Sequence, residues 1–396
     1  MQVRLAGGGG GTPDTMTAEV RAAVLEADLL VGASRLLESL PEGCTTNRQA
    51  AVRAQAVLEI LQTACAEHPC VVFSGDSGFY SGTQSLVPLL QAAGIAYAIL
   101  PGISSVQLLA ARLGRPWQDW NLVSAHGEDC DAVGAVCGGK PAFFLTGSDP
   151  AEVCRQLAAA GLGMLPVTAG ERLSYPDERI VCGTAAELAA QAFAPLAVLL
   201  VEPAPQAERR PGMPDDGFIR GNVPMTKQEV RAAVSAKLAV KPWETVWDVG
   251  AGTGSVSVEL SGQARQVYAV ECGAEACGLI RQNRERFCAW NLTLVEGMAP
   301  EALQPLPPPD AVFIGGTKGK MAAVAAAALA KNPCVRFCIS AVALETLPAA
   351  MAALAAHEVP TEVTQIAVSR TRPAGSLHLL TANNPVFLIT GRGGPR

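Results

Sequence analysis

The sequence lacks the features by which metal sites, membrane segments and nucleic-acid-binding surfaces are usually recognised. Its 12 cysteines include no C-x-x-C pair, and only four histidines accompany them, whereas a structural zinc site needs paired ligands at short spacing. The longest apolar run, residues 321–330, is too short to span a bilayer. No block of like charges occurs, and the formal net charge is −6, which argues against a nucleic-acid partner. We therefore expect no metal, no membrane segment and no bound nucleic acid.

The start of the chain and its scattered cysteines indicate a cytoplasmic protein. Met1 leads almost directly into an apolar stretch, residues 3–6, without the basic and apolar regions of a signal peptide. Unpaired cysteines are typical of small buried side chains in a reducing compartment.

The length of 396 residues predicts two domains of ordinary size. Residues 203–217 are rich in proline, glycine and charge, which is typical of a linker. We place the boundary at residue 205, which gives domains 1–205 and 206–396.

Strand-like and helix-like segments alternate in the first half, which predicts an α/β domain with a largely parallel sheet. The expected strands are 3–6, 28–31, 70–74, 95–100, 121–124, 142–145 and 197–201. The expected helices are 17–26, 48–66, 82–93, 104–113 and 151–160.

The second half repeats the alternation and then closes with two strands that have no helical pattern between them. We expect a doubly wound sheet that ends in an antiparallel hairpin. The expected strands are 245–249, 266–271, 292–295, 311–314, 336–339, 362–368 and 386–390.

A glycine-rich turn, residues 248–254, follows the first strand of the second half. Its G-x-G-x-G spacing lets a ligand approach the backbone, and Glu271, after the next strand, is placed to accept hydrogen bonds from ribose hydroxyls. The alternative is a tight turn without a ligand. Asp248 and the terminal hairpin favour S-adenosylmethionine over NAD. Residues 310–316 lack the Asn/Asp-Pro-Pro-aromatic motif of amino-methyltransferases, which favours methylation at carbon.

Three glycine-bearing loops of the first half, residues 7–11, 74–82 and 101–105, each follow an expected strand. Such loops at the carboxyl ends of strands describe a ligand crevice. Ordinary strand-to-helix turns are the alternative.

These loops resemble motifs of the tetrapyrrole methylase family, specifically at residues 7–14, 75–78 and 101–105. Residues 124–127 and 170–180 are also similar to a subgroup that methylates carbon 5 of a corrin precursor. The second half resembles a companion enzyme that methylates carbon 15 and removes the ring C acetate carboxylate, at residues 212–218, 225–231 and 246–259. The fusion of the two in this order resembles the precorrin-6Y methyltransferase (decarboxylating) family.

The resemblance implies a tetrapyrrole-methylase α/β domain followed by a Rossmann-like class I methyltransferase domain. It implies an S-adenosylmethionine-dependent enzyme of cobalamin biosynthesis that methylates a precorrin or cobalt-precorrin ring at carbons 5 and 15 and decarboxylates it to precorrin-8. One cofactor per domain and a homo-oligomer are expected. Methylation of RNA or protein, or a non-catalytic cofactor-binding scaffold, remain alternatives.

The motifs and the resemblance together give the expected cofactor-binding residues. In the first domain these are Gly7, Gly9, Gly75, Asp76, Gly78, Phe79, Ser104 and Ser105. In the second domain they are Thr226, Asp248, Gly250, Gly252, Gly254, Glu271, Met298 and Ala299. Gly10 and Ser77 replace the usual prolines of the first-half motifs, and Met298 replaces an acid that often contacts adenine.

The sequence contains no recognisable nucleophile constellation, and methyl transfer needs alignment more than a protein nucleophile. The candidates for a catalytic role are His126, as a proton shuttle or a structural histidine, and Lys227 and Arg231. Seven cations are candidates to bind the carboxylates of the ring. The alternative for each is a solvated surface charge. They are Arg220, Lys227, Arg231, Lys318, Lys320, Arg370 and Arg372.

Overall fold

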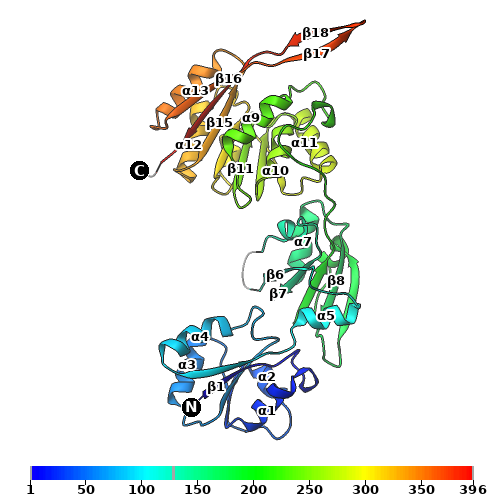
Figure 1. Ribbon diagram of the computed structural model, residues 1–396, viewed down its shortest axis with the longest axis vertical. Helices are drawn as coiled ribbons and strands as arrows, with labels where there is room; N and C mark the ends of the chain where they lie inside the picture. Colours follow the sequence, from blue (N-terminus) through cyan, green and yellow to red (C-terminus); the bar gives the residue numbers. More distant parts are fainter. Residues whose placement is uncertain (1, 127–129, 395–396) are drawn as a thin grey trace. The chain divides into compact units, whose positions relative to one another are not determined.

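The computed structural model describes residues 2–126 and 130–394. Gly127, the last residue of one quoted motif, therefore lies outside the described part. The chain divides into two compact units, Met1–Ala204 and Pro205–Arg396, each of which is described by itself (Figure 1). In the described ranges, no helix is both long and apolar enough to cross a membrane.

The first sheet of the first unit is parallel throughout, with strand order β3-β2-β4-β1-β5. Helices α1 and α2 pack on one face through one apolar cluster, and α3 and α4 pack on the other through a second. The strands are β1 (Gln2–Gly7), β2 (Leu29–Gly32), β3 (Arg48–Ala50), β4 (Pro69–Phe73) and β5 (Ala96–Leu100). The helices are η1 (Pro13–Thr15), α1 (Ala18–Glu26), α2 (Ser34–Glu38), α3 (Ala54–Thr63) and α4 (Thr83–Ala92).

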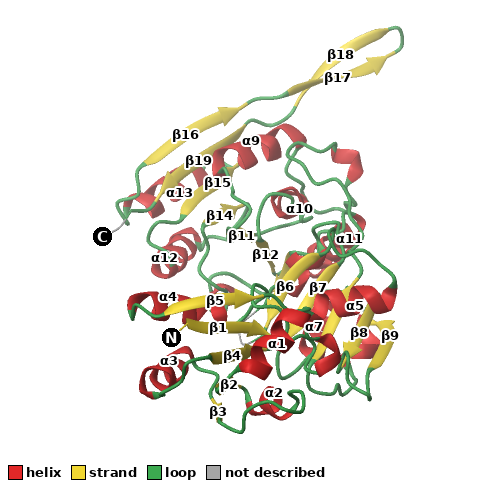
Figure 2. Ribbon diagram, turned by 60° about the horizontal axis from the view of Figure 1, so that its bottom comes forward, coloured by secondary structure: helices red, strands yellow, loops and turns green. Residues whose placement is uncertain are grey.

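The second sheet of this unit has the order β6-β7-β10-β8-β9, and only β6 and β7 are parallel. Figure 2 shows these strands as a group separate from β1 to β5. The strands are β6 (Asn121–Ala125), β7 (Ala142–Thr146), β8 (Pro166–Glu171), β9 (Arg179–Thr184) and β10 (Ala197–Val201). The helices are α5 (Ser105–Leu113), α6 (Ala132–Val136), α7 (Ala151–Ala159) and α8 (Ala185–Ala189).

The expectation of one largely parallel sheet is therefore wrong for the second half of this unit. Strands β8 and β9 were not predicted: β9 is an edge strand without a buried side chain, and β8 is largely buried but contains a single strongly apolar residue, Val167. The expected helix over residues 48–66 is also too long: residues 48–50 form the exposed edge strand β3, and the helix begins at Ala54.

The second unit has a seven-stranded sheet of order β13-β12-β11-β14-β15-β19-β16, in which β19 is antiparallel to both of its neighbours. Helices α9 to α11 contribute to one apolar cluster and α12 and α13 to the other, so both faces are covered as expected. The strands are β11 (Thr245–Val249), β12 (Gln266–Glu271), β13 (Leu292–Glu296), β14 (Ala311–Ile314), β15 (Arg336–Ala341), β16 (Thr361–Ile366) and β19 (Val386–Arg392). The helices are η2 (Asp215–Gly217), α9 (Gln228–Leu238), α10 (Ser255–Ser261), α11 (Ala274–Arg286), η3 (Glu301–Leu303), α12 (Met321–Lys331) and α13 (Thr346–Ala355).

An additional hairpin, β17 (Ser369–Ala374) and β18 (Leu377–Ala382), is inserted between β16 and β19 and projects from its unit (Figure 1). It was not predicted, because every residue of β18 is exposed and the strand shows no alternation of buried and exposed positions.

Most of the expected linker is part of the second unit. The backbone N–H groups of Gly212 and Met213 donate to the Glu259 carboxylate at 2.8 and 3.0 Å, and the Met213 side chain is buried. A buried carboxylate that needs donors fixes this segment, although its composition is that of a linker.

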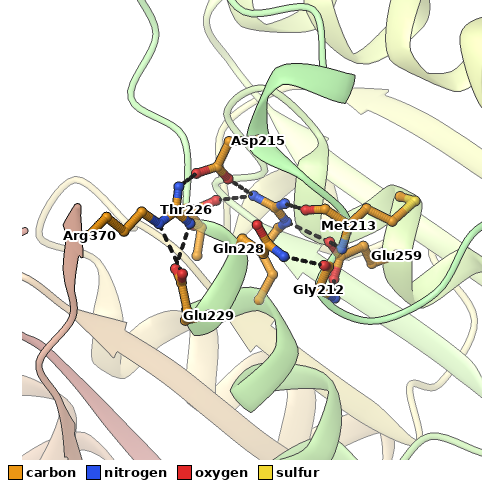
Figure 3. A network of polar contacts seen from close by, with 9 residues as sticks. Gly212, Met213, Asp215, Thr226, Gln228, Glu229, Glu259 and Arg370 are labelled. Atoms are coloured by element: carbon orange, nitrogen blue, oxygen red, sulfur yellow. Dashed lines mark hydrogen bonds and ion pairs between the residues drawn. The ribbon is translucent and has the colours of Figure 1, made fainter. Parts of the chain in front are cut away.

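A buried arginine organises this region. The Arg231 side chain is fully buried and donates to Glu259 at 2.7 Å and to Asp215 at 2.8 Å. Asp215 also accepts from Arg370 of β17, and Arg370 pairs with Glu229 of α9 (Figure 3). One network thus joins the segment before α9, helices α9 and α10, and the base of the hairpin.

The Arg231→Met variant tests this network, because it leaves the buried Glu259 carboxylate without its cation. We expect the free energy of unfolding to fall by roughly 3–5 kcal/mol in denaturant titrations. Arg281→Met removes an exposed pair with Glu296 and should cost less than about 1 kcal/mol. Equal losses in the two variants would contradict the structural role of Arg231.

Candidate functional site

The three glycine loops of the first unit meet at the carboxyl edge of the parallel sheet. The loops after β1 and β4 pair through their backbones, since the N–H of Gly75 donates to the carbonyl of Gly9 at 2.8 Å. A Cβ added to Gly7 would lie 2.6 Å from the nitrogen of Gly102 in the third loop. Because backbone meets backbone here, no side chain can be accommodated at Gly7.

Asp76 fastens the loops to each other. One carboxylate oxygen accepts from the N–H of Gly102 at 3.1 Å, and the other accepts from the N–H of Gly78 at 2.7 Å. Ser77, which stands where the family motif usually has proline, is buried and donates to the carbonyl of Leu100 at 3.4 Å. Ser104 caps α5 in a capping box. These residues hold the shape of the loops.

A cavity of about 360 Å³ lies beside the loops. Five expected residues line it: Gly9, Gly75, Phe79, Ser105 and His126. Four expected residues do not line the cavity, and their contacts lie within and between the loops: Gly7, Asp76, Gly78 and Ser104. The opposite wall comes from β7, β10 and residues 172–175. Residues 172–175 belong to the 170–180 stretch quoted for the carbon-5 subgroup, but none of them was among the expected site residues.

His126 follows β6, and its ring is held at the cavity. Nδ1 lies 3.2 Å from the carbonyl oxygen of Thr146. In the neutral ring this contact makes Nδ1 the protonated nitrogen and leaves Nε2 as an acceptor. The geometry is compatible with both roles considered for this residue.

The glycine turn of the second unit connects β11 to α10. Gly250, Gly252 and Gly254 have φ values of 72°, 57° and 76°, a left-handed conformation that favours glycine. A Cβ on Gly250 would lie 2.8 Å from the nitrogen of Gly316, so the loop after β14 also depends on this turn.

A cavity of about 490 Å³ opens beside the turn. Of the expected residues, Thr226, Lys227, Gly250 and Gly252 line it. Asp248, Gly254, Glu271, Met298 and Ala299 are not among its lining residues. Residues of β14, β15 and β19, and the ends of the β17–β18 hairpin, complete the wall.

Two buried oxygens at the turn have no hydrogen-bond partner. Asp248 is fully buried; its Oδ2 accepts from Ser257, whereas its Oδ1 accepts from no described residue. The hydroxyl of Thr253, which lines the cavity, is also buried and unpartnered. Burial raises the pKa of Asp248 to about 7. Buried polar atoms normally have partners, so these two fit a site that a polar ligand completes.

Glu271 lies at the end of β12 with its carboxylate against the turn. Oε2 accepts from the N–H of Gly252 at 3.0 Å, and Oε1 accepts from the N–H groups of Cys272 and Gly273, each at 2.8 Å. A carboxylate offers about four acceptor positions, so capacity remains for a ligand hydroxyl. The loop with Met298 adjoins this strand end, since Gly297 donates to the Glu271 carbonyl at 2.8 Å.

The cations expected to bind carboxylates differ in their surroundings. Arg231 and Arg370 belong to the buried network, which gives them structural roles, and Lys320 pairs with Glu301 at 3.0 Å. Lys227 lines the cavity. The remaining three are exposed and do not line it: Arg220, Lys318 and Arg372.

In comparisons with known proteins, each of the two units matches a protein family. Residues 2–189 match the tetrapyrrole (corrin/porphyrin) methylases, and residues 218–391 match a precorrin methyltransferase domain. A precorrin-6Y C(5,15)-methyltransferase (decarboxylating) of Sinorhizobium sp is 35% identical over 315 residues, which cover 75% of this chain and 74% of the relative. The chain belongs to the precorrin-6Y C(5,15)-methyltransferase family. This membership confirms the resemblance seen in the sequence, the two-part α/β fold and the methyltransferase class.

Two further similarities concern the second unit. A probable cobalt-precorrin-6B C(15)-methyltransferase (decarboxylating) of Pyrobaculum calidifontis is 42% identical over 185 residues, which cover 46% of this chain and 95% of the relative. A crystal structure of a precorrin-6Y C5,15-methyltransferase from Geobacter metallireducens is 37% identical, covers 46% of this chain and 96% of its own, and has a TM-score of 0.44.

Gly102→Ala tests the convergence of the first-unit loops. The added methyl group would press on the carbonyl oxygens of Gly75 and Gly7, and a displacement of about 1 Å can cost roughly 100-fold in rate. We expect a loss of that order in methyl transfer, measured by product analysis. Gly138→Ala, where the nearest atom is 3.9 Å away, is the matched control. Equal rates in both variants would show that the loops tolerate the displacement.

Asp248 predicts a pH dependence of stability. Burial raises its pKa from 3.8 to about 7, so its contribution to stability is largest below pH 4 and is lost as the pH rises towards 7. The Asp248→Asn side chain cannot ionise, so the variant lacks this pH dependence. Between pH 4 and pH 7, the difference in unfolding free energy between variant and wild type should therefore change by an amount on the order of 4 kcal/mol. Urea titrations from pH 4 to 8 measure it. A constant difference would rule out the raised pKa.

Proposed function

We propose that this chain is an S-adenosylmethionine-dependent C-methyltransferase of cobalamin biosynthesis. It methylates a precorrin-6 or cobalt-precorrin ring at carbons 5 and 15 and decarboxylates the ring C acetate, giving precorrin-8. The observation that carries the proposal is the presence of two cavities walled by glycine loops, one in each unit, in a chain of this family. The first unit, residues 1–205, methylates carbon 5, and the second, residues 206–396, methylates carbon 15 and decarboxylates.

Each unit binds one S-adenosylmethionine, which supplies the methyl group when bound. In the second unit, Glu271 accepts hydrogen bonds from the ribose hydroxyls, and the backbone at Met298 and Ala299 holds the adenine. The unpartnered oxygens of Asp248 and Thr253 support a polar ligand at the turn. In the first unit, Gly9, Gly75 and Ser105 line the cavity and let the ligand approach the backbone.

The residues of the chain orient the reactants and exclude water. Transfer from a sulfonium to an electron-rich carbon depends on alignment, which can contribute roughly 7–11 kcal/mol. The conjugated ring accepts the electron pair released by decarboxylation, so no further cofactor is needed. Lys227, which lines the second cavity, is the cation placed to bind a ring carboxylate there.

Substrate class and assembly complete the proposal. The net charge of −6 opposes an RNA substrate, and two sets of glycine loops oppose a non-catalytic scaffold. The exposed side chains of Leu377, Leu379 and Leu380 on the β17–β18 hairpin support a homo-oligomer. Cys65, Cys182 and Cys272 are exposed free thiols, which supports a cytoplasmic location.

The division of labour is tested in the full chain with metal-free and cobalt-loaded rings. Wild type should add two methyl groups and release one carbon dioxide, as seen by mass spectrometry. Gly102→Ala should lose methylation at carbon 5. When the Gly102→Ala protein is mixed with a variant protein that lacks the second site, the mixture should carry out both reactions. If neither ring reacts with wild type and S-adenosylmethionine, the proposed function falls.

Glu271→Ala serves as that second variant when the cofactor concentration is limiting, because it weakens the second site without abolishing it. Loss of hydrogen bonds to a charged group should weaken cofactor binding at the second site by roughly 1.5–3 kcal/mol, measured as a rise in the cofactor KM for methylation at carbon 15. Glu285→Ala, an exposed position on α11, is the control. An unchanged KM in Glu271→Ala would remove this residue from the site.

A further inference from the structure

One arginine in the first-unit cavity has no acidic partner among the described residues. Arg35 lies in α2, directly after β2, and it lines the cavity beside the glycine loops. The buried side chains of Leu36 and Leu37 anchor its helix in the core, so the guanidinium projects from a rigid element.

The contacts of Arg35 are to neutral oxygens. Its guanidinium donates to the hydroxyl of Tyr175 and, at 3.5 Å, to the hydroxyl of Ser74. A Cβ on Gly11, whose φ is 101°, would lie 2.7 Å from Nη1 of Arg35. The glycine loop therefore packs directly over this cation, which an L side chain at position 11 would displace.

Three acids at the end of β8 and in the segment that follows it are engaged with other arginines. Asp177 pairs with Arg172 at 2.6 Å, Glu178 pairs with Arg112 at 2.5 Å, and Glu171 pairs with Arg179. Within residues 2–126 and 130–394, no carboxylate lies at ion-pair distance from Arg35. The second arginine lining the cavity, Arg172, is thus neutralised, whereas the charge of Arg35 is not.

The surroundings of Tyr175 keep the guanidinium in place. Its hydroxyl accepts from Arg35, and the guanidinium of Arg172 lies over its ring, 4.7 Å from the centroid. A guanidinium offers five donors in a planar fork that matches a carboxylate. An oriented fork with donors to spare and an uncompensated charge fits one carboxylate.

We propose that Arg35 binds one carboxylate of a ligand in the first-unit cavity. The proposal rests on the proposed function, because both ligands of that function carry the group. The carboxylate belongs either to a peripheral acetate or propionate of the tetrapyrrole or to the methionine part of S-adenosylmethionine. Sequence reasoning missed Arg35, since an isolated arginine after a short strand has no motif.

The test uses Arg35→Gln in the full chain and measures methylation at carbon 5. Loss of a charge-assisted hydrogen bond should raise one KM by about 10- to 100-fold. A rise confined to the KM of the tetrapyrrole assigns the carboxylate to the ring, and a rise confined to the KM of the cofactor assigns it to the methyl donor. Arg35→Lys should recover part of the loss, because it keeps the charge without the fork.

Three controls separate binding from folding. Methylation at carbon 15 by the same polypeptide should be unchanged, as should both reactions in Arg53→Gln, an exposed position on the same unit. Tyr175→Phe, which removes an acceptor and no charge, should have a smaller effect than Arg35→Gln. If Arg35→Gln leaves both KM values unchanged or alters only kcat, the proposal is overturned. Absence of methylation at carbon 5 in wild type would instead reject the proposed function.

Discussion

Close approach of backbone to backbone is the constraint on which both cavities depend. In the first unit, the loops after β1, β4 and β5 are so near one another that a single Cβ on Gly7 would meet the backbone of Gly102. In the second unit, Gly250 has the same relation to Gly316. Two different sheets thus form a cavity by the same means: strand ends are brought together with no side chain between them, which leaves backbone donors and acceptors beside the cavity.

The charged groups of the described residues fall into two kinds: those that pair with each other and those beside a glycine loop that lack a charged partner. Arg231, Glu259, Asp215 and Arg370 satisfy one another, and this buried network ties the segment before α9 to the sheet and the hairpin. By contrast, Asp248 and Arg35 border the glycine loops with an unpartnered oxygen or an uncompensated charge. The unpartnered oxygen of Asp248 and the charge of Arg35 fit ligand sites, because polar groups in a protein interior otherwise have partners.

The sequence predicted the elements that strong apolar patterns specify and missed those without such a pattern. The five parallel strands of the second unit were predicted almost to the residue, because each is a short run rich in apolar and β-branched residues. Strands β3, β9 and β18 were missed, since their residues are largely exposed. The glycine motifs located both cavities, but side chains from distant segments, such as Arg35 and Tyr175, could not be placed beside them without the fold.

The same limit applies to Arg231. From the sequence it is one cation among seven near a ligand motif, and only burial distinguishes it from Lys227. A corrin precursor carries many carboxylates, yet the cations lining the cavities are few: Arg35 and Arg172 in the first and Lys227 in the second. Most ring carboxylates must then stay hydrated or meet cations outside these cavities.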